Sequence, residues 1–252
     1  MNYDEAFYAQ QRAGSKLSAE KVVPYLYELL GPNSVLDIGC GVGTWVSAFK
    51  KAGCETSNGM DGSWALESDL EIPKDDFIAF DFISSPAPFR PSLPLERYDL
   101  ITTFEFAEHI FEHSAEALVD LITSKSDAVI FGAALPLQGG AHHVNEQWPS
   151  YWATKFAKRG FVSCDFIRPY FWDDLEVRPW YSQNAIGYFR GEVPKPVREA
   201  ARAAWENRGP LSLVHPSSWL HVNSLAEPTS KNITRQANLL ARRTAKKLLR
   251  RS

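Results

Sequence analysis

The stretch Val35-Leu36-Asp37-Ile38-Gly39-Cys40-Gly41-Val42-Gly43-Thr44 decides the fold of this 252-residue chain. Its first half is an apolar run with one acidic residue, Asp37, and is typical of a short buried strand. Three glycines at alternate positions follow, and a helical pattern then runs over 44–52. Glycine lets the backbone turn sharply and lets a ligand approach without a Cβ in the way. The pattern therefore predicts a ligand site at the carboxyl end of a strand in a parallel sheet.

Strands and helices alternate after this motif. Such alternation implies parallel pairing through right-handed crossovers. Short apolar runs predict four further strands with a helix at 116–124 before the last of them, and these strands lie near 55–60, 77–80, 98–104 and 128–133.

The region beyond the fifth strand predicts how the sheet ends. A helix is expected to open at Pro149 and to end at Gly160. Two strands, at 161–167 and 183–189 with no helix between them, then predict an antiparallel hairpin. The expected fold class is α/β: a Rossmann-like, seven-stranded, mostly parallel sheet with helices on both faces and an antiparallel last strand.

Three parts of the chain are expected. Residues 1–33 form a helical lead-in, whose helix starts near Ser18 or Lys21 and stops at Gly31-Pro32. The ligand-binding domain covers 34–192 and includes a loop at 136–152 that would face an acceptor. Residues 193–252 form a helical extension that ends in a basic tail.

The net charge of −3 hides an asymmetry between this tail and the rest of the chain. Residues 231–252 contain eight of the 27 Lys and Arg residues and no acid, so the remaining body has 19 basic and 30 acidic residues. Because the rest of the chain is so acidic, we predict that the protein has no nucleic-acid partner. The tail has the pattern of a basic amphipathic helix, which would lie on an anionic membrane or dock on a partner; a solvated, frayed end helix is the alternative.

Targeting features and cysteines favour a cytoplasmic protein. No run approaches the roughly 18 apolar residues of a membrane span, and the first residues lack a secretory signal pattern. Cys40, Cys54 and Cys164 lack metal-type spacing and are expected to be reduced thiols. If the tail binds a membrane, the location would be its inner face.

A dinucleotide site is the first alternative for the glycine turn, and the spacing argues against it. That fingerprint requires G-x-G-x-x-G, but the sixth position is Thr44 counted from Gly39 and Val46 counted from Gly41. Asp37 would also repel a pyrophosphate. A ligand with a sulfonium, an ammonium and no phosphate suits that carboxylate better.

In this motif the chain resembles class I S-adenosylmethionine-dependent methyltransferases. The resemblance implies S-adenosylmethionine as the cofactor, with Asp61 on the ribose hydroxyls and Asp81 near the adenine amino group. A turn or N-cap role is the alternative for each of these two acids. The full set of cofactor-binding residues that it implies is Asp37, Gly39, Cys40, Gly41, Gly43, Thr44, Trp45, Asp61, Gly62, Ser63, Asp81, Phe82, Phe104 and Glu105.

The segment Phe104-Glu105-Phe106-Ala107-Glu108-His109 resembles the E-x-x-E-H stretch of small-molecule methyltransferases. It does not resemble the Asn/Asp-Pro-Pro-aromatic motif of enzymes that methylate base amino groups, which again counts against a nucleic-acid substrate. The resemblance implies that its first residues line the cofactor and that His109 approaches the acceptor. A structural histidine is the alternative.

The segment 139–152 is dense in polar and aromatic groups. With Trp180-Tyr181-Ser182-Gln183-Asn184, it resembles a subgroup of bacterial methyltransferases of polysaccharide and glycan biosynthesis, and the whole resemblance covers about 15–190. It implies a sugar or glycan acceptor. The substrate-binding residues that it implies are His142, Asn145, Gln147, Trp148, Tyr151, Trp180, Tyr181, Gln183 and Asn184, although some aromatic residues here must belong to the core.

These features predict an O-methyltransferase that acts on a sugar or glycan hydroxyl. A base must take the hydroxyl proton, and His143 is favoured, with His109 or Glu146 as alternatives. No metal is predicted; a divalent ion at His143 and Glu146, chelated by substrate hydroxyls, is the alternative. A methyltransferase for another small molecule or secondary metabolite, and a cofactor-binding protein without catalysis, are the remaining hypotheses.

Overall fold

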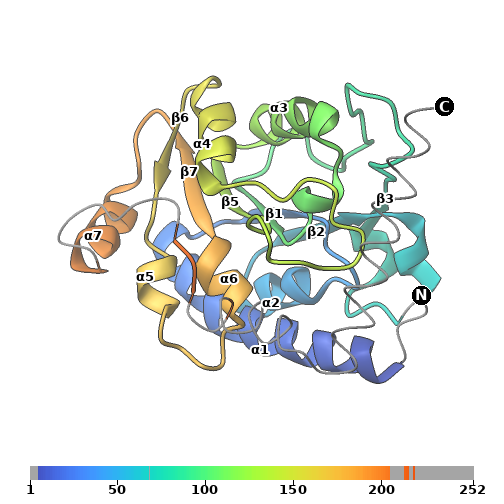
Figure 1. The fold of residues 1–252 in the computed structure, drawn as a ribbon, viewed down its shortest axis with the longest axis horizontal. Coiled ribbons are helices and arrows are strands. Elements are labelled where there is room, and N and C mark those ends of the chain that lie inside the picture. The colour runs from blue at the N-terminus through green and yellow to red at the C-terminus, as the bar shows by residue number, and fades with distance from the viewer. Residues whose placement is uncertain (1–4, 68, 205–212, 216–217, 219–252) are drawn as a thin grey trace. The chain divides into compact units, whose positions relative to one another are not determined.

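The computed structural model describes residues 5–67, 69–204, 213–215 and 218 (Figure 1). The chain divides into a unit of residues 1–215 and a second unit of 216–252, and the description below concerns the first. The predicted amphipathic tail at 231–252 lies outside the described residues. Within the described part of the chain, no helix is long and apolar enough to cross a membrane.

One seven-stranded sheet forms the centre of the fold, in the order β3-β2-β1-β4-β5-β7-β6. Every neighbouring pair is parallel except those made by β7, which runs antiparallel to both β5 and β6. The predicted fold class is therefore confirmed. The strands are β1 Ser34–Ile38, β2 Thr56–Asp61, β3 Phe77–Ala79, β4 Leu100–Phe104, β5 Ala128–Gly132, β6 Phe161–Cys164 and β7 Ile186–Arg190.

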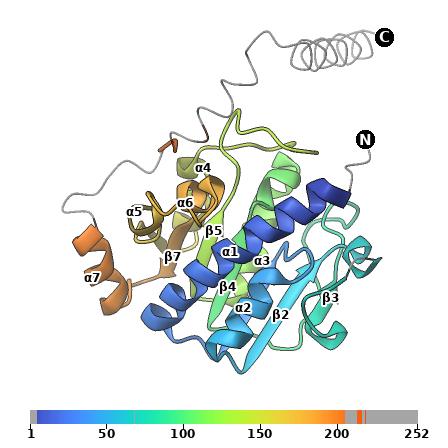
Figure 2. The same ribbon diagram turned by 90° about the horizontal axis from the view of Figure 1, so that it is seen from below.

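Helices cover both faces of this sheet (Figures 1 and 2). On one face, α3 and α4 bury Leu118, Trp152 and Phe156 against the strands. On the other face, α1 and α2 bury Leu26 and Phe49 in a second apolar cluster. The helices are α1 Glu5–Leu30, α2 Thr44–Ala52, α3 Ala115–Lys125, α4 Pro149–Ala157, α5 Arg168–Phe171, α6 Pro179–Asn184 and α7 Lys195–Ala204, and 3-10 turns lie at Ser63–Glu67, Lys74–Asp76, Ala107–His109 and Glu112–Ser114.

The first helix differs from the prediction at its start. It does not begin near Ser18 or Lys21; α1 already includes Glu5 and continues through Pro24. Ala19, Val22 and Leu26 are buried against α2 and the sheet, so packing of one apolar face outweighs the disfavoured proline. The helix ends as expected, with Gly31 at a left-handed φ of 53°.

The connection between the last two strands also differs. The prediction that no helix lies between them is wrong, because α5 and α6 both do, and Gln183 and Asn184 belong to α6 rather than to a strand. Pro179 stands at the first turn of α6, where its missing N–H costs nothing. The antiparallel pairing of β6 with β7 is nevertheless confirmed.

The strand order reverses its direction at β1, in the middle of the sheet. From β1 the sheet grows toward β2 and β3 on one side and toward β4 and β5 on the other. The loops that follow β1 and β4 therefore leave neighbouring strands at the point where the order reverses. Open parallel sheets bind ligands at such a point.

Candidate functional site

The glycine turn after β1 forms the floor of the site. Gly39, Gly41 and Gly43 have left-handed φ values of 79°, 54° and 90°, which a side chain would strain. A Cβ on Gly39 would lie 2.3 Å from the Phe106 side chain, whereas a Cβ on Gly41 would meet nothing within 4 Å. The turn is therefore closed by Phe106 over Gly39 and open over Gly41.

A buried carboxylate stands beneath this turn. Asp37 is 2% exposed, and its Oδ1 accepts a hydrogen bond of 2.7 Å from the Thr102 hydroxyl of β4. Burial raises the pKa of Asp37 to about 7; the hydrogen bond from Thr102 opposes this rise, and the nearby Asp61 adds to it. A bound cation would favour the ionised carboxylate.

Asp61 joins the end of β2 to the glycine turn. Its two carboxylate oxygens accept hydrogen bonds of 2.7 Å from the N–H groups of Gly41 and Gly62. Burial raises the pKa of Asp61, and these two hydrogen bonds oppose the rise. The ring of Trp64 lies against Gly62, where a Cβ would come within 1.9 Å of it. Asp61 and Trp64 thus border the open side of the turn.

Asp81, by contrast, caps a turn. Its Oδ1 accepts the N–H groups of Ile83 and Ser84 at 2.9 and 3.2 Å, and its other oxygen accepts the Ser84 hydroxyl. Hydrogen bonds, chiefly that from the Ser84 side chain, lower the pKa of Asp81. This placement matches the turn role that was the alternative for Asp81.

Most other residues of the predicted cofactor set are buried next to the glycine turn or pack against Phe106. Trp45 stacks on Phe104, with ring centroids 4.2 Å apart, in the core. Phe82 packs edge-on against Phe106, with centroids 5.1 Å apart. Cys40 and Thr44 are buried, and Ser63 is exposed at the start of a 3-10 turn.

Glu105 is held in an unusual conformation directly after β4. Its φ is 52°, a left-handed value that is rare outside glycine, and such strain collects at functional sites. Its carboxylate accepts hydrogen bonds from Gln138 and Asn184, at 2.6 and 2.7 Å. Burial raises the pKa of Glu105 to about 7, against these hydrogen bonds. Gln183 in turn donates to Asn184 at 3.0 Å, so two of the four predicted substrate residues in α6 support Glu105.

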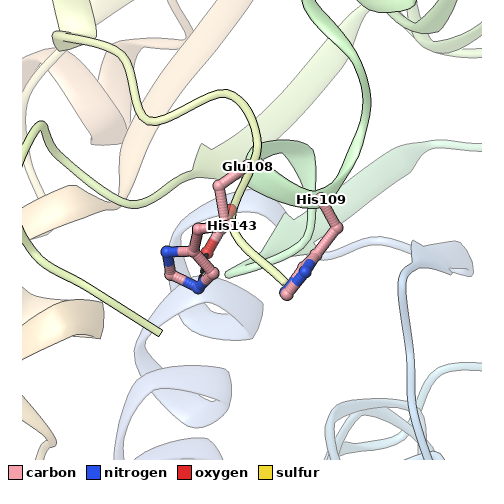
Figure 3. Close-up of side chains that lie close together, drawn as sticks. All are labelled: Glu108, His109 and His143. Atoms are coloured by element: carbon pink, nitrogen blue, oxygen red, sulfur yellow. Dashed lines mark ion pairs between the residues drawn. The ribbon is translucent and has the colours of Figure 1, made fainter. Parts of the chain in front are cut away.

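The turn after β4 and the acceptor loop bring Glu108, His109 and His143 together (Figure 3). Glu108 is 0% exposed, and among the described residues neither of its carboxylate oxygens makes a hydrogen bond of normal geometry. Burial and then the neighbouring Glu105 raise its pKa, and the backbone N–H groups of Glu108 and Ala134 oppose this rise. Burial, followed by the proximity of His143, lowers the pKa of His109 to about 4, so this ring is neutral near pH 7.

Backbone hydrogen bonds position the acceptor loop. The N–H groups of Val144 and Asn145 both donate to the Glu108 carbonyl oxygen, at 2.9 and 3.0 Å. This contact turns His143 inward, where its Nε2 lies 3.9 Å from Oε1 of Glu108. The preceding His142 has a left-handed φ of 59° and is exposed. The two adjacent histidines therefore occupy different environments.

Glu146 holds the other nitrogen of the His143 ring. Nδ1 of His143 lies 2.9 Å from Oε1 of Glu146, and the same carboxylate accepts the N–H groups of Leu137 and Gly139. Although burial acts against it, these hydrogen bonds lower the pKa of Glu146. Because an ionised carboxylate can only accept, His143 donates its Nδ1–H, and in the neutral ring the lone pair is then on Nε2.

The remaining predicted acceptor residues are spread over several environments. Asn145 is buried and accepts a hydrogen bond from Gln147 at 2.9 Å. Trp148 is 42% exposed. Tyr151 lies under the Lys155 ammonium, and Trp180 lies beside the Arg178 guanidinium. Tyr181 is buried among Trp45 and Phe104, with its hydroxyl 2.6 Å from that of Ser15.

Two residues of this site were not predicted from the sequence. Glu108 is absent from the predicted site residues, although its place in the E-x-x-E-H spacing was a signal for it. Gln138 is also absent, and nothing in its sequence surroundings marked it. The structure identifies both, through the buried carboxylate of Glu108 and through the bond from Gln138 to Glu105.

A glycine turn at the switch point of a parallel sheet, bordered by carboxylates at the ends of β1 and β2, defines the class as a Rossmann-like methyltransferase fold. A family model described as "Methyltransferase domain" matches residues 8–174, about two thirds of the chain. The chain therefore belongs to the methyltransferase domain family. No curated protein matches it.

Solved structures share the fold at low identity. The plantazolicin methyltransferase BpumL, in complex with a monoazolic desmethylPZN analog and S-adenosylhomocysteine, has a TM-score of 0.51 and 16% identity, covering 73% of this chain and 87% of that chain. The methyltransferase domain of bacterial CtHen1-C has a TM-score of 0.50 and 17% identity, covering 71% and 100%. Magnesium protoporphyrin IX methyltransferase from Synechocystis PCC 6803, with bound S-adenosylmethionine, has a TM-score of 0.50 and 16% identity, covering 76% and 86%.

Proposed function

We propose that this chain is an S-adenosylmethionine-dependent O-methyltransferase that transfers a methyl group to a hydroxyl of a sugar or glycan. The observation that carries the proposal is the position of the His143 ring. In the neutral ring its Nε2 carries the lone pair, and this atom lies at the turn after β4, whose Phe106 packs over Gly39 of the glycine turn. The resemblance of the acceptor loop to enzymes of glycan biosynthesis supports the acceptor class.

The residues around the glycine turn fit S-adenosylmethionine. The open space over Gly41 accepts a ligand that a Cβ would exclude, and the buried Asp37 favours a positively charged group over a phosphate. Asp61 keeps one further lone pair on each oxygen for ribose hydroxyls. Gly41, Asp37 and Asp61 would therefore hold the cofactor. When bound, it supplies a methyl group already activated on a sulfonium.

The chain then has two tasks, orientation and proton removal. Orientation of the acceptor oxygen in line with the methyl carbon and sulfur is the main contribution. A sugar hydroxyl is a weak nucleophile, so its proton must leave as the new bond forms. Nε2 of His143 can take this proton, while Glu146 holds Nδ1 and fixes the orientation of the ring. Glu146 is thus a positioning residue in this proposal rather than the base.

An apolar small molecule, such as a secondary metabolite, is the second candidate acceptor. The acceptor loop exposes Leu137, Val144 and Trp148, with exposed fractions of 74%, 49% and 42%. Exposed apolar groups beside a ligand site can bind an apolar acceptor. They can equally pack against the C–H faces of a sugar.

A methylation screen tests the proposed function. Release of S-adenosylhomocysteine is measured with the full chain, S-adenosylmethionine and panels of glycosides, oligosaccharides and apolar phenols, each with and without a chelator. We expect acceptor-dependent release with members of the glycoside panel. Release with phenols alone would favour the second candidate. If none of the acceptors caused release although S-adenosylmethionine binds measurably, the chain would be a cofactor-binding protein without catalysis.

The glycine turn provides a prediction with a matched control. Gly41→Ala and Gly31→Ala both place a Cβ in open space at left-handed φ values of 54° and 53°. Each should cost about 1–2 kcal/mol of stability. Only Gly41→Ala should lower S-adenosylmethionine affinity, by about tenfold or more, because its Cβ enters the space for the cofactor. Calorimetric titration and thermal denaturation check both, and equal affinities in the two variants would contradict the assignment of the cofactor turn.

A further inference from the structure

We propose that Glu108, His109 and His143 bind a divalent cation, and that this cation holds two neighbouring hydroxyls of the acceptor. One ligand atom from each residue can be chosen so that all three lie within 4.8 Å of one another (Figure 3). Small movements of side chains would bring them around one ion at normal ligand distances. Holding the hydroxyls rests on the proposed function, whereas cation binding does not.

The carboxylate of Glu108 is the strongest argument for a cation. It is 0% exposed, and in the part of the chain that the structure describes neither oxygen makes a hydrogen bond of normal geometry and no Lys or Arg pairs with it. The groups that favour its ionised form are the backbone N–H groups of Glu108 and Ala134. Burial of a carboxylate is costly unless hydrogen bonds or an opposite charge compensate. Glu105 and Glu146 add negative charge around it. A divalent cation supplies the missing compensation.

The two histidines present suitable nitrogen atoms. Glu146 holds Nδ1 of His143, so the lone pair on Nε2 faces Glu108 across 3.9 Å. A carboxylate on the far nitrogen is the usual second partner of a metal-binding histidine, because it fixes the ring and raises its basicity. His109 meets the His143 ring edge-on, with centroids 5.0 Å apart.

The ligand set also indicates the kind of cation and its task. Two imidazole nitrogens and one carboxylate oxygen suit Mn²⁺, Fe²⁺, Co²⁺ or Zn²⁺ better than all-oxygen cations such as Ca²⁺. Three protein ligands leave coordination positions open, and two adjacent sugar hydroxyls can occupy them. The cation then lowers the pKa of the bound hydroxyl, which gives its proton to water as the new O–C bond forms. In that state Nε2 of His143 is a ligand and no longer takes the proton itself.

Titration of the full chain with Mn²⁺, followed by the electron paramagnetic resonance signal of the free ion, tests the site. We expect one bound ion in the wild type and at least tenfold weaker binding in Glu108→Gln, His109→Ala and His143→Ala. The chain offers a matched control in Glu112→Gln and His113→Ala, which change the same pair of residue types four positions later at the exposed surface. Both controls should bind Mn²⁺ like the wild type.

The outcomes separate this inference from the proposed function. Absence of Mn²⁺ binding below about 1 mM, or binding that survives all three substitutions, overturns the cation site. S-adenosylmethionine titration of each variant verifies folding, and Glu108→Gln should fold because the neutral amide has nearly the size and shape of the carboxyl group. Mn²⁺ binding without methylation of any acceptor would leave the site standing and refute the proposed function. Methylation that a chelator does not slow would refute the cation site and leave the proposed function standing. If acceptors with a single hydroxyl were methylated as fast as acceptors with two adjacent hydroxyls, the chelation of two hydroxyls would be refuted.

Discussion

Replacement of His143 by alanine is expected to lower kcat for methyl transfer by about 100-fold or more, with S-adenosylmethionine affinity unchanged. Positioned proton transfer typically contributes a factor of about 100–10,000. The ring lies at the acceptor loop, and its substitution leaves the glycine turn and Asp37 in place. Steady-state kinetics with the best acceptor and calorimetric titration of S-adenosylmethionine give the two values. If Nε2 of His143 binds a cation instead, kcat should also fall in His143→Ala, because the variant loses a ligand of that cation.

The control for this variant is His113→Ala. His113 is exposed and stacks on Phe111, with ring centroids 5.6 Å apart, outside the site. Its substitution should leave kcat within about twofold of the wild type. If His143→Ala kept turnover within the same range, neither the base role nor the ligand role of His143 would survive.

Asp37→Asn is expected to weaken S-adenosylmethionine binding by about 100-fold or more. Loss of one partner of a buried ion pair costs roughly 3–5 kcal/mol. The Asp37 carboxylate is 2% exposed beneath the open glycine turn, so water cannot replace it there. Calorimetric titration measures the change. Asp127→Asn, which alters an exposed carboxylate paired with Arg97 and Arg190, is the control and should bind the cofactor normally.

The same residue predicts a dependence on pH. The pKa of Asp37 is about 7 in the folded chain, above the ordinary value of 3.8, and a bound cation lowers it. Below pH 7 the cofactor must therefore displace a proton, and its affinity should rise with pH between 5 and 7, by up to about tenfold per unit. Asp37→Asn should show no such rise. An equally steep rise in the variant would assign the effect to another group.

The raised pKa also affects stability in the absence of the cofactor. Between pH 3.8 and about 7 the folded state binds the Asp37 proton more tightly than the unfolded state does, so this group makes folding less favourable as pH rises. Relative to the wild type, Asp37→Asn should therefore gain stability across this window, measured as Tm at each pH. The cofactor site thus favours binding at the expense of the stability of the free protein.

Local sequence patterns were sufficient for most of the fold. The helix at 44–52 was predicted with its observed bounds, because Gly43 and Gly53 mark both ends. Parallel strands followed from their alternation with helices. The failures lie where packing outweighed local preference: α1 continues through Pro24 because its apolar face is buried, and α6 replaces the start of a strand.

The candidate site divides in the same way. Spacing was enough to place Asp37 and Gly41 at one turn, because glycines and an acid at a strand end carry a local signal, and the family resemblance added Asp61. Spacing was not enough to show which nitrogen of His143 is held, or that the Glu108 carboxylate is fully buried. The Nδ1 contact joins His143 to Glu146, three positions away, and depends on how the loop folds. The surroundings of Glu108 depend on residues more than thirty positions apart that meet at the Glu108 carbonyl.

By itself, the sequence determined a mostly parallel sheet with a glycine turn that suits a cationic ligand, since hydrophobic period and glycine spacing act over a few neighbouring residues, and the resemblance of that turn indicated a methyltransferase. Only the tertiary structure decided the chemistry of the acceptor side. There the burial of Glu108, the neutral ring of His109 and the orientation of His143 come from contacts between distant segments, and burial and partners, not residue type, set the charge and reactivity of a side chain.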